Sequence, residues 1–499
     1  MRVHKTQLVA AVATIMIALI VMVSAPTALG ATLSVTATPD IGPPTSTIQV
    51  SGSGFPATAA VDIYFDTTDL ALAVTNASGA FSGISLQVPG AAVPGTHWIS
   101  AVARTSGQAA QEAFTVETDW PQFHYSASHK GRNPYENVIT ATTVGTIDLD
   151  WTFTTGKAIT SSPAVVGGTV YVGSQDNNLY AINATTGAQV WKFATGNSIT
   201  SSSPAVANGT VYVGSTDDYL YSINATTGAQ NWKFKTGAGI QSSPAVVNGV
   251  VYIGSTDNSV YAVNAATGAQ IWKFTTGNQV LSSPAVSQGI VYVGSYDNSV
   301  YGINASTGTQ LWKYTTGGKV FSSPMVSDGW VFVGSDDANF YCLNGRTGTL
   351  VWKFAGTTGT EFESSPAGFG SAVYVGSDAG FFYAITGRNG TQIWNLSVTP
   401  AVEVSSPSIA SGLEFVGMGN NIYAVETIVT ATILWTGTTG ATVTATPVVA
   451  DGVLYVASQD GNLYAFDQNG ATHQRIVPPE PPNPATLRPD RSLVPSLSR

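Results

Sequence analysis

The sequence of 499 residues predicts an all-β protein, an eight-bladed β-propeller preceded by a β-sandwich. Two observations predict this fold class. A unit of about 40 residues, each with several short strands, occurs eight times. The region before these units has short alternating runs separated by Gly and Pro. We expect a signal peptide (residues 1–30), a sandwich (31–117), a propeller (118–472) and a proline-rich disordered tail (473–499).

The N-terminus has the pattern of an export signal. Arg2, His4 and Lys5 precede an apolar run from Leu8 to Val23, and Ala28-Leu29-Gly30 offers small residues for cleavage. Because this run is short for a bilayer span, we expect cleavage and no membrane span afterwards. An uncleaved anchor is the alternative. Either way, the protein is expected to be secreted or held at the cell surface.

The region 31–117 is expected to form a sandwich of about seven strands, with strands at 47–51, 60–65, 81–88, 97–102 and 113–116. Four motifs resemble the immunoglobulin-like modules of exported bacterial and archaeal proteins: Gly52-Ser53-Gly54-Phe55-Pro56, Val61-Asp62-Ile63-Tyr64-Phe65, Asn76-Ala77-Ser78-Gly79 and Pro94-Gly95-Thr96. The resemblance implies a spacer or adhesive unit.

The repeats are marked by two residues in step. A Ser-Ser-Pro or its equivalent recurs with prolines at Pro163, Pro204, Pro244, Pro284, Pro324, Pro366, Pro407 and Pro447. A tryptophan recurs at Trp151, Trp191, Trp232, Trp272, Trp312, Trp352, Trp394 and Trp435. The first tryptophan strand precedes the first proline, and the last unit has no such strand. The first strand is therefore expected to complete the last blade, which closes the ring and removes its open edges.

Each unit also carries a turn before its tryptophan. The run Ala181-Ile182-Asn183-Ala184-Thr185-Thr186-Gly187-Ala188-Gln189-Val190-Trp191 resembles the tryptophan-docking motif of PQQ-like propellers. A small first residue leaves room for the indole, and Thr-Gly makes the turn. The lead-in from Asp119 to Gly131 also resembles the segment that opens many such propellers. The resemblance spans residues 118–470 and implies structural docking roles for the eight tryptophans.

The family name suggests a bound pyrroloquinoline quinone, but the residues do not predict a cofactor. The quinone alcohol dehydrogenases that this repeat resembles hold adjacent cysteines against the quinone, whereas Cys342 is the only cysteine here and occupies a docking position. A repeated aspartate, first seen at Asp176, is expected to serve its own turn rather than a metal. His124 and His129 are neighbours in the lead-in, but no nucleophile–base set or metal cluster is found.

A binding site is expected at the rim of the central channel. In the segment before each proline, residues alternate along an extended strand. Ile159 and its equivalents take the apolar positions and are expected to pack between blades. The residues that alternate with them vary between units and are expected to face the channel or its rim. The candidate ligand-binding residues are Gln241, Gln279, Lys319, Phe321, Glu361 and Glu363.

Composition and repetition favour a binding role. A net charge of −10 and a pI near 4.8 argue against a nucleic-acid partner. The first four units are nearly identical, whereas catalysis needs different residues converging on one point. We therefore expect a non-catalytic exported scaffold that contacts proteins or glycans at the cell surface. The alternatives are a quinone-dependent dehydrogenase, and an assembly factor that resembles the propeller lipoprotein assisting outer-membrane barrel assembly.

Overall fold

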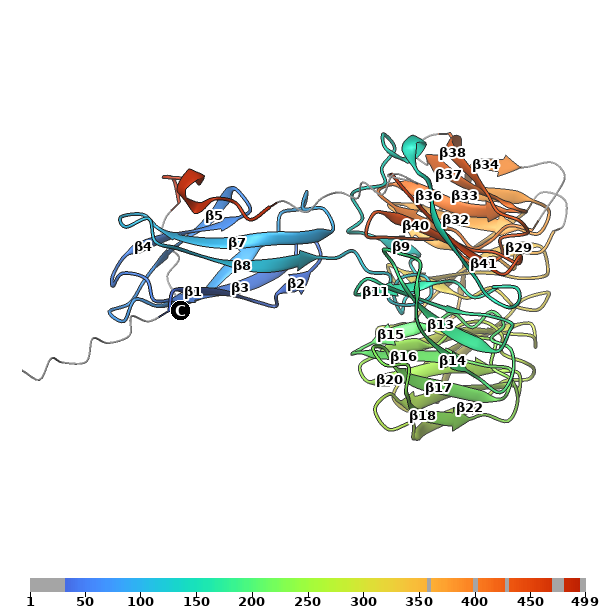
Figure 1. The fold of residues 1–499 in the computed structure, drawn as a ribbon. Coiled ribbons are helices and arrows are strands. Elements are labelled where there is room, and N and C mark those ends of the chain that lie inside the picture. The colour runs from blue at the N-terminus through green and yellow to red at the C-terminus, as the bar shows by residue number, and fades with distance from the viewer. Residues whose placement is uncertain (1–31, 357–359, 398–402, 427–429, 469–479, 494–499) are drawn as a thin grey trace, which may run out of the picture.

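The computed structural model describes residues 32–356, 360–397, 403–426, 430–468 and 480–493. The predicted signal peptide therefore lies outside the described residues. Two all-β parts are seen in Figure 1, a sandwich drawn in blue and a ring of small sheets drawn from green to orange. Within the described residues, no helix has the length and apolar character needed to cross a bilayer.

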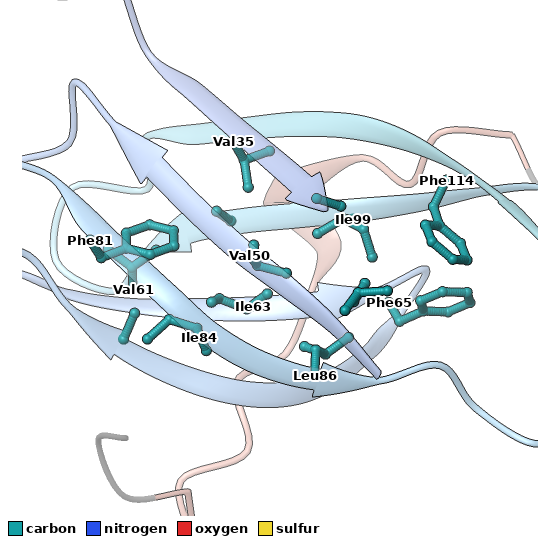
Figure 2. Close-up of a cluster of buried hydrophobic side chains, with 14 of the residues drawn as sticks. Val35, Val50, Val61, Ile63, Phe65, Phe81, Ile84, Leu86, Ile99 and Phe114 are labelled. Atoms are coloured by element: carbon teal, nitrogen blue, oxygen red, sulfur yellow. The ribbon is translucent and has the colours of Figure 1, made fainter. Parts of the chain in front are cut away.

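The N-terminal part consists of two sheets. The first has the order β1(Ser34–Thr38), β3(Thr47–Ser53), β6(Phe81–Gln87). The second has the order β2(Ile41–Gly42), β8(Ala109–Val116), β7(Gly95–Ala103), β4(Ala60–Phe65), β5(Thr68–Val74). Alternate residues of both sheets, among them Val50, Ile63 and Phe114, meet in one apolar core (Figure 2). Strands are present at all five predicted positions, and the immunoglobulin-like assignment stays a prediction.

The strands that follow Glu117 form eight sheets within the described residues, which we number as blades 1–8. In blades 1–7 the four strands pair antiparallel and in chain order, the innermost strand first; blade 8 takes its outer strand from the start of the ring. Blades 1–4 are β11(Ala164–Val166), β12(Thr169–Gly173), β13(Asn178–Asn183), β14(Gln189–Ala194); β15(Ala205–Ala207), β16(Thr210–Gly214), β17(Tyr219–Asn224), β18(Gln230–Lys235); β19(Ala245–Val247), β20(Val250–Ser255), β21(Ser259–Asn264), β22(Gln270–Thr275); and β23(Ala285–Ser287), β24(Ile290–Ser295), β25(Ser299–Asn304), β26(Gln310–Thr315).

Blades 5–8 follow the same plan, with one addition. They are β27(Met325–Ser327), β28(Trp330–Gly334), β29(Asn339–Asn344), β30(Leu350–Ala355); β31(Ala367–Phe369), β32(Ala372–Ser377), β33(Phe381–Thr386), β34(Gln392–Ser397); β35(Ser408–Ala410), β36(Leu413–Met418), β37(Asn421–Glu426), β38(Thr432–Thr438), to which β9(Arg132–Asn133) adds; and β39(Val448–Ala450), β40(Val453–Ala457), β41(Asn462–Asp467) with β10(Asp148–Thr154). Two short 3-10 turns, η1(Val144–Thr146) and η3(Pro484–Thr486), complete the described elements.

The ring closes as the sequence predicts. Strand β10 pairs antiparallel with β41, from Asp148 opposite Asp467 to Thr154 opposite Asn462, so the first strand of the ring is the outer strand of blade 8. Hydrogen bonds between β10 and β41 therefore close the ring, and the strand edges that an open row of blades would expose are paired.

The tryptophans connect neighbouring blades. In blade 3, Trp272 Nε1 donates a 2.8 Å hydrogen bond to the carbonyl oxygen of Ala305 in the docking turn of blade 4. Its ring covers Gly308, where an added Cβ would lie 2.7 Å from the indole. The same bond is made by Trp151, Trp191, Trp232, Trp312 and Trp352, and Trp435 bonds the carbonyl oxygen of Ile147 ahead of β10. Cys342 lies in register with Trp352 and is fully buried, as its docking position predicts.

Residues 480–493, part of the tail predicted to be disordered, are among the described residues. This segment lies on the sandwich (Figure 1), where Gln111 Nε2 donates 2.7 Å to the carbonyl oxygen of Pro482 and the Asp490 N–H donates 2.7 Å to Asp69 Oδ2. Leu487 is 8 % exposed. Proline removes donors for a ladder, but it leaves carbonyl groups that side chains of a neighbouring sheet can bond.

Candidate functional site

A ring of hydroxyls builds the wall of the central channel. The second residue of each Ser-Ser-Pro accepts a hydrogen bond from the backbone N–H of its counterpart in the preceding blade, at 2.9 Å from Ser162 N to Ser203 Oγ. The Thr446 N–H donates to Ser162 Oγ at 2.9 Å, which joins blade 8 to blade 1. The wall is lined by the hydroxyl residues Ser162, Ser203, Ser243, Ser283, Ser323, Ser365, Ser406 and Thr446. The seven serine hydroxyls thus hold neighbouring blades together.

The lead-in segment crosses one end of this channel. In blades 1, 2 and 4–7, one backbone N–H of the innermost strand donates to a backbone carbonyl of the lead-in. The bonds run from Val165 to Trp120 at 2.8 Å, from Val286 to Ala127 at 2.6 Å and from Ile409 to Gly131 at 2.7 Å. In blade 3, Val246 N–H bonds Gln122 Oε1, and Asn133 Nδ2 donates to Val449 in blade 8. One short segment therefore touches all eight blades.

Phe123 and two histidines form the floor that this segment gives to the channel. Phe123 lines the channel, and its ring lies 4.4 Å from that of His124 and 5.3 Å from that of His129. Burial lowers the pKa of His124 to about 3 and that of His129 to about 4, so both imidazoles are neutral at pH 7. His129 Nδ1 lies 3.1 Å from the carbonyl oxygen of Pro324. The two histidines therefore pack as neutral side chains below the channel.

The remaining opening is a cavity of about 240 Å³. The alternation of the segment before each proline is as predicted, because Ile159, Ile240, Val280, Val320, Phe362 and Val443 are fully buried. Of the six candidate residues, Gln241, Phe321 and Glu363 line the cavity. Gln279, Lys319 and Glu361 are not in its wall, and each lies two residues further toward the rim.

A second residue type completes the rim, and sequence reasoning missed it. In the repeated loop that follows Gly-Ser, the backbone N–H of the next residue, x, donates to the backbone carbonyl of the outer rim residue of its own blade. Tyr296 bonds Gln279, Asp336 bonds Lys319 and Asp378 bonds Glu361, at 2.9, 2.9 and 3.1 Å. The available signal was the x position itself, which is Gln, Thr and Thr in blades 1–3 and is aromatic or acidic in blades 4–6.

Carboxylates gather on the rim of blades 5–7. We call Asp336, Glu361, Glu363, Asp378 and Glu403 the acidic rim. Carboxylate oxygens of Glu361, Glu363 and Asp378 lie within 4.8 Å of one another. Burial, then the neighbouring carboxylates, raises the pKa of Glu363 to about 7 and the pKa values of Asp378 and Asp336 to about 6. A cation at this rim would favour the ionised carboxylates, which burial and mutual repulsion otherwise disfavour.

Aromatic rings and one lysine adjoin the acidic rim. The Tyr296 and Phe321 rings have centroids 6.4 Å apart, and Lys319 Nζ lies 4.9 Å from the centre of the Tyr296 ring. Lys319 therefore covers an aromatic face as well as adding the one positive charge that the sequence places among these rim residues. The rim thus combines carboxylates with flat apolar surface, which is the chemistry that receives cationic side chains.

The repeated aspartates serve the scaffold, as expected, but they reach beyond their own turns. Asp176 Oδ1 accepts from Asn178 N at 3.1 Å within its loop, and its Oδ2 accepts from Tyr180 Oη and from Gly156 N of the adjoining blade, both at 2.7 Å. The same set recurs at Asp217, Asp337 and Asp460. Each of these four carboxylates therefore accepts from at least three donors.

The channel does not fit a quinone of the dehydrogenase type. Pyrroloquinoline quinone is a tricarboxylate, and the described residues of the wall include Glu363 and Glu403 but no lysine or arginine. Cys342 is buried beside Trp352 in blade 5, away from the wall. The donor set is thus of the wrong charge for this cofactor.

The four-stranded sheets and their docked tryptophans define a PQQ-like β-propeller. Residues 136–256, 216–323, 315–426 and 402–494 match the PQQ-like repeat family described as outer membrane protein assembly factor BamB. The chain belongs to this family. A comparison with curated protein sequences finds no match.

Solved structures share the fold at low identity. The chain is similar to BamB from Moraxella catarrhalis (15 % identity, 64 % of this chain and 99 % of that chain, TM-score 0.56). It is also similar to the quinohemoprotein alcohol dehydrogenases ADHIIG from Pseudomonas putida HK5 (17 %, 76 % and 83 %, 0.62) and from Comamonas testosteroni (16 %, 73 % and 82 %, 0.61). At such identities the likeness shows the fold alone.

Proposed function

We propose that this protein is a non-catalytic, exported binding protein that acts as an assembly factor in the cell envelope. Its family is described by such a factor, and its fold offers a rigid ring rather than a converging catalytic set. The predicted export signal supports the location. The proposed partner is a protein, and a cell-surface glycan is the second class of ligand.

The acidic rim is the observation that carries the proposal. Glu363 and Asp378 have raised pKa values because they are half-buried and crowded by other carboxylates, and a cationic partner segment would relieve this electrostatic cost. Tyr296 and Phe321 add aromatic surface beside them. We therefore place the contact with a basic segment of the partner at the open mouth, over blades 4–7.

A pull-down from envelope fractions tests the function. The full chain is expected to recover outer-membrane assembly proteins, and the triple variant Glu361→Gln, Glu363→Gln, Asp378→Asn is expected to recover several-fold less. Asp148→Asn, an exposed carboxylate on β10, is the matched control. Recovery that is equal for both variants, or recovery of glycans alone on an array, would contradict the proposed protein-binding rim.

The quinone-dependent dehydrogenase is the alternative that the structural neighbours raise. The acidic wall of the channel argues against it. Incubation of the purified chain with quinone and Ca²⁺ is expected to give no stoichiometric cofactor spectrum and no dye reduction. A bound quinone with alcohol-dependent dye reduction would reverse this ranking.

A further inference from the structure

A second cavity lies on the opposite face, where the lead-in crosses the channel. It has a volume of about 500 Å³, within the range of ligand pockets. Blades 5 and 6 form its walls, and the lead-in residues Lys130 and Arg132 form one side. We call it the blade 5–6 pocket. None of its lining residues belongs to the acidic rim.

Two substitutions across the blade interface shape the pocket floor. At the interfaces of blades 1–2, 3–4 and 4–5, an alanine of one blade and a valine of the next share one apolar cluster, as Ala164 and Val206 do. Here Met325 replaces that alanine and Gly368 replaces that valine. A Cβ added at Gly368 would lie 2.9 Å from Met325 Sδ, so the two changes depend on each other. The exchange conserves volume in the core and leaves glycine backbone and a thioether facing the pocket.

Aromatic residues replace aliphatic and hydroxyl side chains around this floor. Trp330 stands where blades 1 and 2 have Thr169 and Thr210, and its ring lies 6.3 Å from that of Phe332. Phe369 stands where blade 1 has Val166. Trp330 and Phe369 are both partly exposed and both line the pocket. The wall therefore offers apolar and aromatic surface that remains open to an occupant.

Positive charge surrounds this apolar wall. Lys130, Arg132 and Arg388 line the pocket, whereas Asp328 is its one acidic lining residue. Arg388 occupies a turn position that holds Thr185, Thr226, Ala266 and Ser306 in blades 1–4. Among the described residues, none of the three cations has a carboxylate within 4.0 Å, and Arg132 lies 4.6 Å over the Phe369 ring. In a chain with 19 basic and 29 acidic residues, this concentration is unusual.

We propose that the blade 5–6 pocket binds an acidic segment of a partner protein through an apolar or aromatic side chain flanked by carboxylates. The side chain fills the space between Trp330 and Phe369, and the flanking carboxylates meet Lys130, Arg132 and Arg388. Charge complementarity selects the occupant, because a basic segment would meet three unpaired cations. The proposal rests on the proposed function only for the class of occupant, since it concerns another face of the ring.

Fluorescence anisotropy of labelled peptides with the full chain tests this site. The peptides are Asp-Glu-Phe-Leu-Asp-Glu, its basic counterpart Lys-Arg-Phe-Leu-Lys-Arg, and the polar counterpart Asp-Glu-Ser-Ser-Asp-Glu. The first is expected to bind about tenfold or more tightly than either counterpart, and added salt is expected to weaken it. Failure of the first peptide to bind, or equal binding of all three, overturns the proposal.

Variants that restore the repeat make the test specific. Arg388→Ser gives the residue of blade 4, and Met325→Ala with Gly368→Val gives the floor of blades 1–4, so both are expected to fold. Each is expected to weaken the first peptide about tenfold. Lys192→Ala, which removes an exposed lysine of β14, is the control and should leave binding unchanged. Equal binding by all three variants would refute the assignment.

The two proposals fail separately. If the peptides do not bind while the envelope pull-down still depends on the acidic rim, the blade 5–6 pocket is wrong and the proposed function stands. If the pull-down fails while the acidic peptide binds in the expected order, the pocket stands and the acidic rim is wrong.

Discussion

A carboxylic acid is buried without a partner between blades 6 and 7, and its replacement should stabilise the protein. Glu414 is fully buried, and neither of its carboxyl oxygens has a hydrogen-bond partner. It lies in register with Ile409 and Val425, which belong to the apolar cluster of this interface. The other seven blades carry an apolar residue here: Val170, Val211, Val251, Val291, Val331, Val373 and Leu454.

The variant Glu414→Val should therefore be more stable than the natural chain. A buried carboxyl without a hydrogen bond costs about 1–3 kcal/mol even when neutral, and valine packs at this position in six other blades. The gain should be about 1–3 kcal/mol in the free energy of unfolding. For a cooperative unit of several hundred residues, this corresponds to a midpoint rise of roughly 1–4 °C.

The gain should also depend on pH. Burial raises the pKa of Glu414 well above its ordinary value, so the folded state holds a proton that the unfolded state releases above about pH 4.3. The natural chain therefore loses stability as pH rises from there to the folded pKa. Relative to Glu414→Val, the loss should be about 1.4 kcal/mol per pH unit within that window.

Urea unfolding at pH 5 and pH 6 measures both effects. The matched control is Glu414→Gln, which removes the titration but keeps an unpaired polar group, so it should abolish the pH dependence and recover only part of the gain. A Glu414→Val variant that is less stable than the natural chain, with no pH dependence, would refute the reasoning by showing that the carboxyl is solvated or bonded.

Three further predictions concern docking, the rim and the tail. Trp272→Ala should destabilise the ring by about 3–5 kcal/mol in urea unfolding, because it leaves a cavity and an unbonded carbonyl, whereas Ile271→Ala on the exposed face should change little. Because the pKa of Glu363 is raised to about 7, the free energy of unfolding should fall between about pH 4.5 and 7, and Glu363→Gln should flatten that pH profile. Deletion of residues 480–499 should speed amide hydrogen exchange in β5 and β8, with exchange in the blades as the internal control; unchanged exchange would mean that the tail contact is not formed in solution.

The ring could be predicted because each unit repeats the residues that build it. The docking turn, the small residue beside each indole and the Ser-Ser-Pro wall are local motifs, and each recurs at constant spacing. The pairing of β10 with β41 also followed from counting, since one strand was surplus at the start and one was missing at the end. Periodicity thus carries long-range information when every unit has the same partner.

The parts that were missed depend on contacts between unlike segments. Nothing within the lead-in shows that Trp120 and Gly131 bond different blades. The tail lies on the sandwich through side chains such as Gln111, which a proline-rich composition does not reveal. Glu403 stands four residues before its proline, where Ile159 and its equivalents are apolar, and Val404 takes the packing position instead, so the alternation does not identify Glu403 as a wall residue.

The distribution of these departures around the ring is itself an argument about function. Blades 1–4 keep nearly the same residues, so their sequence is accounted for by the docking, wall and turn bonds that close a ring. Blades 5–7 keep the innermost-strand bonds to the lead-in yet also carry the acidic rim at one mouth and the blade 5–6 pocket at the other face. Random decay would scatter exposed and buried changes independently, whereas Met325 and Gly368 changed as a compensating pair and Arg388 joined them at the same opening. A partner that contacts this side of the ring would meet negative charge at one face and positive charge at the other, which fixes the orientation in which it can bind.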